Sequence, residues 1–173
     1  MALLRKAYTG LKLQINEAKS AVTNAVGRKF LGYALWVAKG TEVKCAVAHK
    51  ALDKLKALIR QLTRRSCGRS IGQVVKKLRP YILGWKAYFG MAQTPKVWRE
   101  LDEWLRHRLR AIQLKHWKRP QTIYRELKAL GASHDVAKQV AGNCHRWWRN
   151  SAKLLNSVLT IAYFDNLGLP RLS

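Results

Sequence analysis

Three neighbouring carboxylates are the first place to look for chemistry in this sequence. Glu100, Asp102 and Glu103 form the only close acidic group in the chain, and clustered carboxylates are what a polymerase or a two-metal nuclease uses to hold magnesium. Here we expect the trio to lie at the start of a helix, where acidic side chains complement the helix dipole. This interpretation gives the trio no catalytic role.

Other patterns for catalysis or metal binding are incomplete. The stretch GNCHRWWRN places Asn143 two residues before His145, a spacing similar to that of a His-Asn-His nuclease motif. No paired metal ligands lie near it in the sequence. Cys45, Cys67 and Cys144 are odd in number, far apart and without a CxxC spacing, which predicts neither a disulfide framework nor a zinc site. There is no phosphate-cradling glycine loop and no nucleophile elbow. We therefore predict no catalytic residue, no metal and no cofactor.

The charge balance points instead to a polyanionic partner. The chain has 34 Lys and Arg against 9 Asp and Glu, a formal charge of +25 over 173 residues. Nucleic acid is the usual partner of so basic a protein. A membrane is disfavoured because no apolar run reaches about 18 residues, and charges interrupt the first twenty residues where a signal peptide would be apolar. Unpaired cysteines favour a reducing compartment, so we predict a cytoplasmic protein.

Basic residues recur in five clusters on successive predicted helices. With balanced charge such rows would be an ordinary solvated face, but here they have few acidic neighbours and predict a positive surface for phosphates. The clusters are Lys56/Arg60/Arg64/Arg65, Lys76/Lys77/Arg79, Arg99/Arg106/Arg110, Lys115/Lys118/Arg119 and Arg146/Arg149. The predicted RNA-binding residues are Arg60, Arg64, Arg65, Lys76, Lys77, Lys86, Arg99, Arg106, Arg110, Lys115, Lys118, Arg119, Arg146 and Arg149.

Aromatic side chains accompany these clusters. In RPYILGWKAYFG, Tyr81, Trp85 and Tyr88 share one helix face at i, i+4 and i+7. They could stack on bases, but rings at this spacing are more often core, and we predict that they pin their helix against the arginine-bearing one, with Gly84 allowing close approach. Trp147 and Trp148 stand between two arginines, a mixture suited to unpaired bases. Adjacent helical residues point about 100° apart, so we expect one buried and one exposed.

These residues must be positioned by a mainly helical fold. Residues 1–10 read as a helix closed by Gly10, and 11–16 and 28–37 read as two strands of a hairpin. Beyond Gly40 the pattern is helical throughout. On the helix expected over 96–118, an apolar stripe is expected at Trp98, Leu101, Leu105, Leu109, Ile112 and His116. A neighbouring wet stripe, one that faces solvent, is expected at Arg99, Arg106 and Arg110. Further helices are expected after Ser70, Pro120 and Ser133, with Pro80 starting or kinking a helix, and a last one over 150–164.

Several sequence blocks, in the same order, resemble one known family. LKLQINEAKSAVTNAVGRKFLGYAL resembles the last conserved block of group II intron reverse transcriptases, and RPYILGWKAYF resembles the signature of their maturase-specific domain. LDEWLRHRLRAIQLKHWK and the ending AYFDNLGLPRLS are similar to the regions that follow in bacterial members. The resemblance spans essentially the whole chain. It implies a multi-helix thumb and maturase domain, preceded by a short β hairpin left from the reverse-transcriptase palm.

The resemblance also sets the expected function. It implies binding of group II intron RNA and help with splicing, and contact with a template–primer RNA/DNA duplex. The family's Tyr-Ala-Asp-Asp motif would precede residue 1, so we expect a truncated, internally started or split product without polymerase activity. We predict two parts, a palm remnant at 1–40 and a thumb/maturase domain at 41–173. Two alternatives stay open: the C-terminal half of a split reverse transcriptase that serves a separate catalytic chain, and a decayed remnant with nonspecific RNA affinity.

Overall fold

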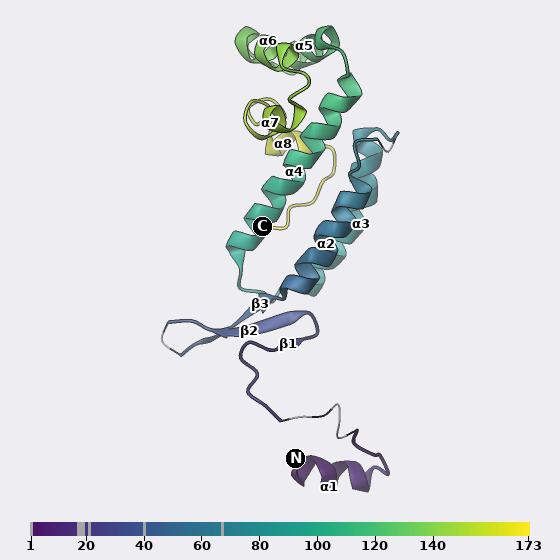
Figure 1. Cartoon of the computed structure of the whole chain (residues 1–173), viewed down its shortest axis with the longest axis vertical. Helices are drawn as coiled ribbons and strands as arrows, with labels where there is room; N and C mark the ends of the chain where they lie inside the picture. Colours follow the sequence, from purple (N-terminus) through teal and green to yellow (C-terminus); the bar gives the residue numbers. More distant parts are fainter. Residues whose placement is uncertain (1, 17–19, 21, 40, 67) are drawn as a thin grey trace.

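The structure is a computed structural model, and it describes residues 2–16, 20, 22–39, 41–66 and 68–173. It is mainly helical with a small antiparallel sheet near the N-terminus, as the sequence predicts. Figure 1 shows an elongated molecule in which helix α4 (Pro95–Trp117) forms the spine. Helices α2 (His49–Leu62) and α3 (Ile71–Tyr88) lie side by side along one part of it. Helices α5 (Pro120–Ala129) and α6 (His134–Gly142) cap one end, and α1 (Ala2–Gly10) lies beyond the other.

The sheet differs from the predicted hairpin. Its order is β1 (Lys29–Phe30), β2 (Tyr33–Val37) and β3 (Val43–Val47), all antiparallel. The strand predicted over 11–16 is wrong, because none of these residues pairs in a strand, and the helix expected from just after Gly40 begins only at His49. Gly40 itself, like residues 17–19 of the INxxKS block, lies outside the described residues. Alternation and β-branched residues marked strand-like stretches, but pairing partners decide which of them become strands.

A tight turn between β1 and β2 brings the sheet against α3. Leu31 and Gly32 both have positive φ, 48° and 82°, as a two-residue hairpin of the I′ type requires. A side chain at position 32 would meet the ring of Phe89, whose Cζ lies 3.1 Å from an ideal Cβ. Glycine therefore serves both the turn and the contact. The Tyr33 hydroxyl donates to the Tyr88 carbonyl, and the Tyr88 hydroxyl donates to that of Leu31.

Several helix boundaries follow from residues that the sequence identifies. Ser70 caps α3 in a reciprocal capping box with Gln73, and Ser133 caps α6 by accepting from the Val136 amide. Pro80 neither ends α3 nor starts a new helix but lies inside it. The single helix predicted over 150–164 is wrong, because α7 (Trp147–Ala152) and α8 (Ile161–Asn166) are separated by turns.

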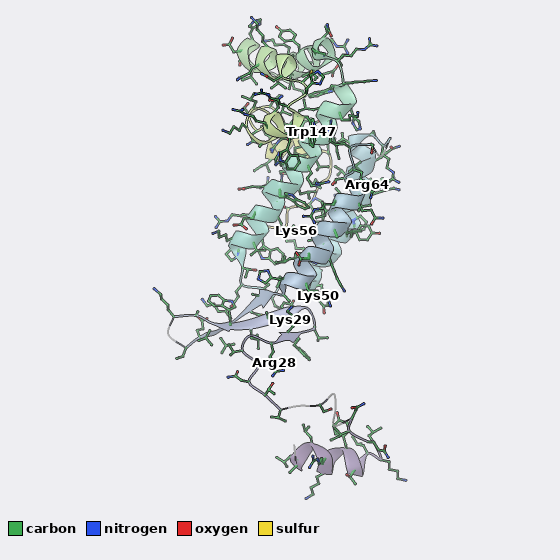
Figure 2. All side chains as sticks on the ribbon, viewed as in Figure 1. Arg28, Lys29, Lys50, Lys56, Arg64 and Trp147 are labelled. Carbon is green, nitrogen blue, oxygen red and sulfur yellow. The ribbon has the colours of Figure 1, made fainter. Side chains whose placement is uncertain are left out.

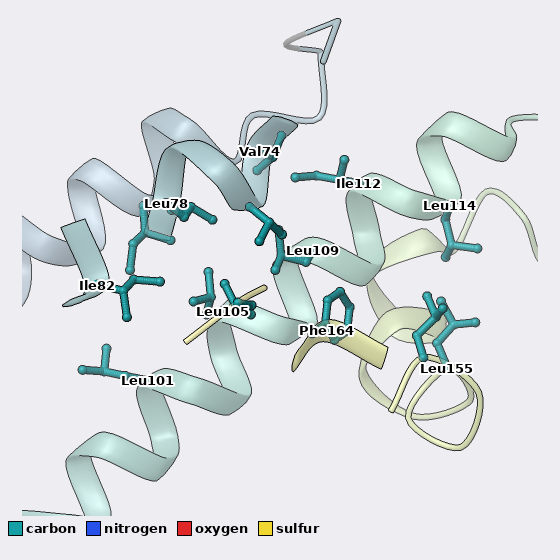
Figure 3. Close-up of a cluster of buried hydrophobic side chains, with 14 of the residues drawn as sticks. Val74, Leu78, Ile82, Leu101, Leu105, Leu109, Ile112, Leu114, Leu155 and Phe164 are labelled. Atoms are coloured by element: carbon teal, nitrogen blue, oxygen red, sulfur yellow. The ribbon is translucent and has the colours of Figure 1, made fainter. Parts of the chain in front are cut away.

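The core lies along α4. Leu101, Leu105, Leu109 and Ile112 are buried as the apolar stripe predicts, whereas His116 is exposed and Trp117 is buried in its place. Figure 3 shows this stripe meeting residues of α3 and of the C-terminal segment. The facing residues are Val74, Leu78 and Ile82 of α3, and Leu155, Phe164, Leu169 and Leu172. Residues 167–173 thus complete the core as a strap along α3 and α4.

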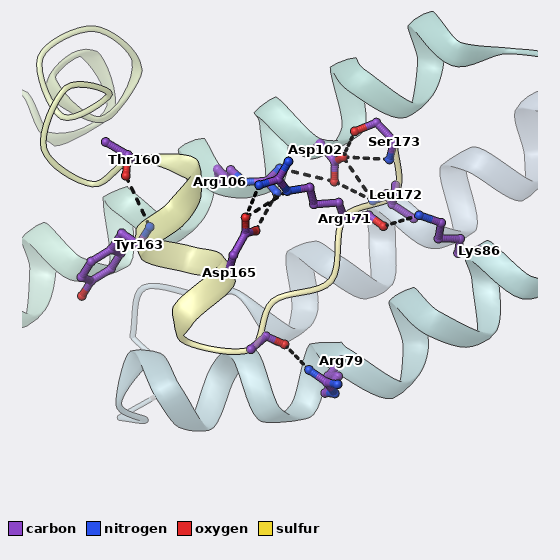
Figure 4. A network of polar contacts seen from close by, with 11 residues as sticks. Arg79, Lys86, Asp102, Arg106, Thr160, Tyr163, Asp165, Arg171, Leu172 and Ser173 are labelled. Atoms are coloured by element: carbon purple, nitrogen blue, oxygen red, sulfur yellow. Dashed lines mark hydrogen bonds and ion pairs between the residues drawn. The ribbon is translucent and has the colours of Figure 1, made fainter.

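Polar contacts fasten this strap (residues 167–173) to both helices. The carboxylate of Asp102 accepts the amide hydrogens of Leu172 and Ser173 at 3.0–3.1 Å. From α3, Arg79 donates to the carbonyl of Gly168 at 2.7 Å, and Lys86 to that of Arg171 at 3.0 Å. Figure 4 shows these contacts together. Asp102 therefore has a structural role, but not in the first helical turn, since α4 begins at Pro95.

Candidate nucleic-acid interface

The exposed basic residues concentrate on α2, on α3 and on the loop between them. From His49 to Tyr88 the chain has eleven Lys and Arg and a single acidic residue, Asp53. These eleven are Lys50, Lys54, Lys56, Arg60, Arg64, Arg65, Arg69, Lys76, Lys77, Arg79 and Lys86. All are exposed except Lys56, Arg65 and Arg69, which are half-buried. We call this set the α2–α3 basic face.

Basic residues also succeed one another along the length of the molecule. Figure 2 shows Arg28, Lys29, Lys50, Lys56 and Arg64 following one another along the long axis toward Trp147. Sequence reasoning missed Arg28, Lys29 and Lys50, because they stand outside the i, i+4 rows on which it relied. Repulsion among such charges is relieved when phosphates bind them.

Two of the predicted RNA-binding arginines lie inside the molecule. The wet stripe predicted on α4 is wrong for Arg106 and Arg110, which are 4% and 7% exposed. Arg106 lies 3.4 Å from Asp102 and 3.7 Å from Asp165, and Arg110 donates from Nε to the Leu159 carbonyl at 2.9 Å. Asp102 belongs to α4 itself, but the C-terminal segment supplies Asp165 and Leu159, which a local helical pattern cannot reveal.

The charges around Arg106 and Arg110 confirm their structural role. Burial, and then the neighbouring Arg106, lower the pKa of Arg110 to about 10. The hydrogen bonds from Arg171 are the main cause that lowers the pKa of Asp165. Arg106, Asp102, Asp165 and Arg171 thus form a charged cluster that fastens α8 and the strap to α4 (Figure 4).

The hollow beside this cluster is not a strongly basic surface. It has a volume of about 790 Å³ and is lined by Arg99, Arg106, Arg110 and Arg171, but also by Glu100, Asp102 and Glu103. Arg99 is exposed there, next to these carboxylates. Negative groups so close would repel phosphates. Of the three arginines predicted on α4, only Arg99 is thus exposed, and it stands in a mixed environment.

The remaining predicted basic residues lie at the surface. Lys115, Lys118 and Arg119 are exposed where α4 passes into α5, and Arg146 and Arg149 are exposed on either side of the tryptophan pair. The expectation of one buried and one exposed tryptophan is confirmed in direction. Trp147 is half-buried against the core, and Trp148 is 40% exposed. The guanidinium of Arg65 lies over the Trp147 ring, 3.6 Å from its centroid, and burial lowers the pKa of Arg65.

The aromatic residues of α3 are only partly structural. Trp85 is half-buried and packs edge-on against Trp98 of α4, with ring centroids 5.1 Å apart. This contact confirms that Trp85 holds α3 against α4. Tyr81 and Tyr88 are 50% and 54% exposed, so their predicted burial is wrong. Tyr88 still fastens the sheet, because its ring stacks on Tyr33 with centroids 6.1 Å apart.

Gly84 does not serve the close approach that the sequence suggests. A Cβ there would meet no atom within 4 Å, and the residue lies in a groove of about 490 Å³ between α2 and α3. Tyr81, Trp85 and Tyr88 line this groove with Leu55 and Leu58. The three rings thus border an open apolar groove rather than filling a contact between helices.

Arg108 is an organising residue that the sequence analysis missed. Its Nε donates to the Thr63 hydroxyl at 2.7 Å. The guanidinium carbons of Arg108 and Arg60 both lie over the Trp104 ring, 5.4 and 5.5 Å from its centroid. Burial, and then Arg60, lower the pKa of Arg108. This contact joins the end of α2 to the middle of α4 and so orients the α2–α3 basic face. The position of Arg108 relative to the leucine stripe of α4 does not predict these contacts from the sequence.

Neither a cluster of metal ligands nor a membrane-spanning helix occurs among the residues that the structure describes. Across the described ranges, no three His, Cys, Asp or Glu side chains come together as a metal site would require. Cys45 and Cys144 are free, and Cys67 lies outside the described residues. In the described part of the chain, none of the helices combines the length and apolar character needed to cross a membrane.

A comparison with known families identifies part of this helical fold. Residues 52–131, from α2 through α5, match the family model of the group II intron, maturase-specific domain. This match supports a maturase-type fragment of a group II intron protein, as the sequence resemblance implies. No curated protein matches the chain.

Proposed function

We propose that this protein binds group II intron RNA and assists its folding into the splicing-active form, without chemistry of its own. The observation that carries the proposal is the α2–α3 basic face: eleven positive residues against one acidic residue, almost all within the stretch that matches the maturase-specific domain. A maturase-type function is what that domain indicates. The RNA contacts and the help with splicing are our inference from the face.

Phosphate contacts explain how such a face would act. Arginine and lysine bind backbone phosphates without reading sequence, so recognition would rest on the shape of a folded RNA whose strands follow the face. A rigid face can hold two RNA segments at a fixed separation that their mutual repulsion opposes. Arg108 and Trp85 contribute indirectly, because they hold α2 and α3 against α4.

A splicing assay with matched charge variants tests the proposal. The variant Arg64→Gln/Lys76→Gln/Lys77→Gln removes three exposed charges from the face, and Lys96→Gln/Lys138→Gln/Lys153→Gln removes three exposed charges elsewhere. We expect the protein to accelerate splicing of its intron at limiting magnesium, the first variant to lose this effect and the second to keep most of it. Equal behaviour of the two variants would contradict the role of the face.

A second candidate function has an observation of its own. Large apolar side chains are exposed along the N-terminal part, among them Leu3 at 84%, Leu11 at 68% and Phe30 at 75%. Such a surface favours a protein partner, and a separate reverse-transcriptase chain would suit it. In that case the protein alone should extend no primer, and adding a chain that carries the catalytic palm should restore extension on an RNA template.

A further inference from the structure

Trp148 is held in a fixed position at the surface. Its ring is 40% exposed, and its inner side is covered by the ring of His107 on α4, with centroids 3.7 Å apart and planes inclined by 32°. Nε2 of His107 lies 2.9 Å from the backbone carbonyl of Trp148, which also accepts from the Ser151 hydroxyl at 2.8 Å. A large ring is therefore immobilised before any ligand arrives, which reduces the entropy lost on binding.

The core does not need this ring. Its neighbour Trp147 packs against the core and lies under the Arg65 guanidinium, and the two tryptophans meet edge to face at 5.6 Å. Trp147 therefore fixes α7 to the helical body, while Trp148 has an outer surface in solvent. An exposed, backed and rigid indole is the arrangement on which a planar π-system stacks.

The charges around Trp148 favour a nucleotide over other planar ligands. Arg146 and Arg149 are exposed on either side of it in the chain. Stacking on an aromatic ring with basic side chains close to it in the chain is the combination of stacking and charge by which proteins bind single-stranded nucleic acid. The protein's formal charge of +25 further favours an anionic ligand.

We infer that Trp148, with Arg146 and Arg149, is a binding site for an unpaired base of single-stranded RNA. The inference rests on the proposed RNA-binding function and adds a contact outside residues 52–131, the part that matches the maturase-specific domain. The α2–α3 basic face would bind phosphates of paired or unpaired RNA alike. Trp148 would bind only where a base is free to leave its stack.

Affinity for two RNAs distinguishes these contributions. The probes are an unstructured oligouridine and a blunt duplex of the same length, titrated into the full chain at several salt concentrations. Trp148→Ala should weaken oligouridine binding by roughly 5- to 150-fold and change duplex binding by less than about twofold, as expected for a contact that only a free base makes. Its salt slope should stay as in the parent, because a stacked ring releases no counterions.

Three further variants serve as controls. Trp148→Phe keeps a ring and should retain much of the oligouridine affinity. Trp36→Ala removes a tryptophan of similar exposure, 43%, from β2 and should leave the preference between the two RNAs unchanged. Arg149→Ala should weaken binding of both RNAs and reduce the salt slope by about one. Thermal melting of each variant beside the parent reports whether the fold is intact.

The outcomes separate this site from the proposed function. If Trp148→Ala binds both RNAs as the parent does, or weakens both equally, the stacking site is wrong while RNA binding stands. If the parent binds neither RNA, the proposed function fails and this inference with it. A selective loss for oligouridine that Trp148→Phe largely restores supports the site.

Discussion

At the scale of single residues, burial determines what the truncation of an arginine does to the protein, as Arg106 of α4 and Arg64 just after α2 illustrate. Arg106 lies between Asp102 and Asp165, whereas Arg64 is exposed at the end of α2. Arg106→Ala removes the buried positive charge that faces the buried carboxylate of Asp102, and breaking a buried ion pair costs about 3–5 kcal/mol of unfolding free energy. Arg64→Ala should change that free energy by no more than about 0.5 kcal/mol.

Urea denaturation of both variants, beside RNA titration, checks this contrast. Arg64→Ala should reduce the salt slope of RNA binding by about one unit and melt like the parent. Arg106→Ala should unfold at much lower urea and lose RNA affinity only as far as it loses structure. If the Arg106→Ala protein has parental stability but binds RNA weakly, Arg106 contacts RNA and its structural assignment is wrong.

The depressed pKa of Asp165 predicts how stability depends on pH. Hydrogen bonds from Arg171 are the main cause that lowers the pKa of Asp165 in the folded state. In the unfolded chain, the pKa of an aspartate is about 3.9. The folded protein therefore binds this proton less readily, so the stabilisation is complete above the unfolded pKa and disappears as pH falls through the folded pKa. Below about pH 4, the melting temperature of the parent should decline more steeply than that of Asp165→Asn. Glu100→Gln, at an exposed site on α4, should decline like the parent.

The candidate site was predictable in residue type but not in accessibility. Clusters of Lys and Arg identify α2 and α3 correctly as basic, because charge is a property of the sequence itself. Burial of Arg106 was not predictable, since its partner Asp165 is 59 residues away along the chain and only the packing of α8 brings it near. The trio of rings on α3 shows the same limit, because the open groove beside Tyr81 depends on where α2 lies.

At the scale of elements, the N-terminal part divides into a segment without buried side chains and a segment that packs against the helices. Residues 2–16, 20 and 22–26 contribute no buried side chain, whereas β2 pairs with β3 over five residue pairs and Tyr33 contacts α3. Deleting residues 1–24 should leave the unfolding free energy nearly unchanged. Deleting residues 1–40 exposes β3 and Phe89 and should destabilise the helices.

Thermal melting and urea unfolding of the two deletion proteins measure this difference. Equal stability of both would show that the sheet is dispensable and would support a boundary at residue 40. That boundary remains a prediction. The structure favours a folding unit that starts nearer Arg28, because the β2–β3 pairing crosses position 40.

Helices were predictable where their signals are local. Ser70 and Ser133 start helices through their own hydroxyls, and the leucine stripe of α4 follows from its period alone. Strands were not, because a strand exists only with a partner. Residues 11–16 alternate well yet belong to no strand of the described ranges, while Val43–Val47 becomes a strand by pairing with β2. The prediction of a single helix over 150–164 was wrong for a related reason. The turns between α7 and α8 bring Leu155 and Leu159 into the core, which a local pattern does not show.

At the scale of the whole molecule, charge governs how RNA binding responds to salt. If the protein contacts roughly 6–10 phosphates, its affinity should fall about 10³- to 10⁵-fold between 50 and 200 mM salt. Fluorescence anisotropy with a folded RNA at several salt concentrations gives the slope directly. The triple variant of the α2–α3 basic face should show a slope smaller by about three. A flat response in the parent would contradict binding through phosphates.

The strap affects how the protein folds while the ribosome synthesises it. The amide of Leu172 reaches Asp102 across 70 positions of the chain, which at about 5–20 residues per second takes about 4–14 s to synthesise. During that delay α4 exposes the leucines that Phe164, Leu169 and Leu172 will later cover, and exposed apolar surface of this kind aggregates or recruits chaperones. Translation products that stop between α6 and α8 should therefore be insoluble or chaperone-bound, although they contain the whole stretch that matches the maturase-specific domain.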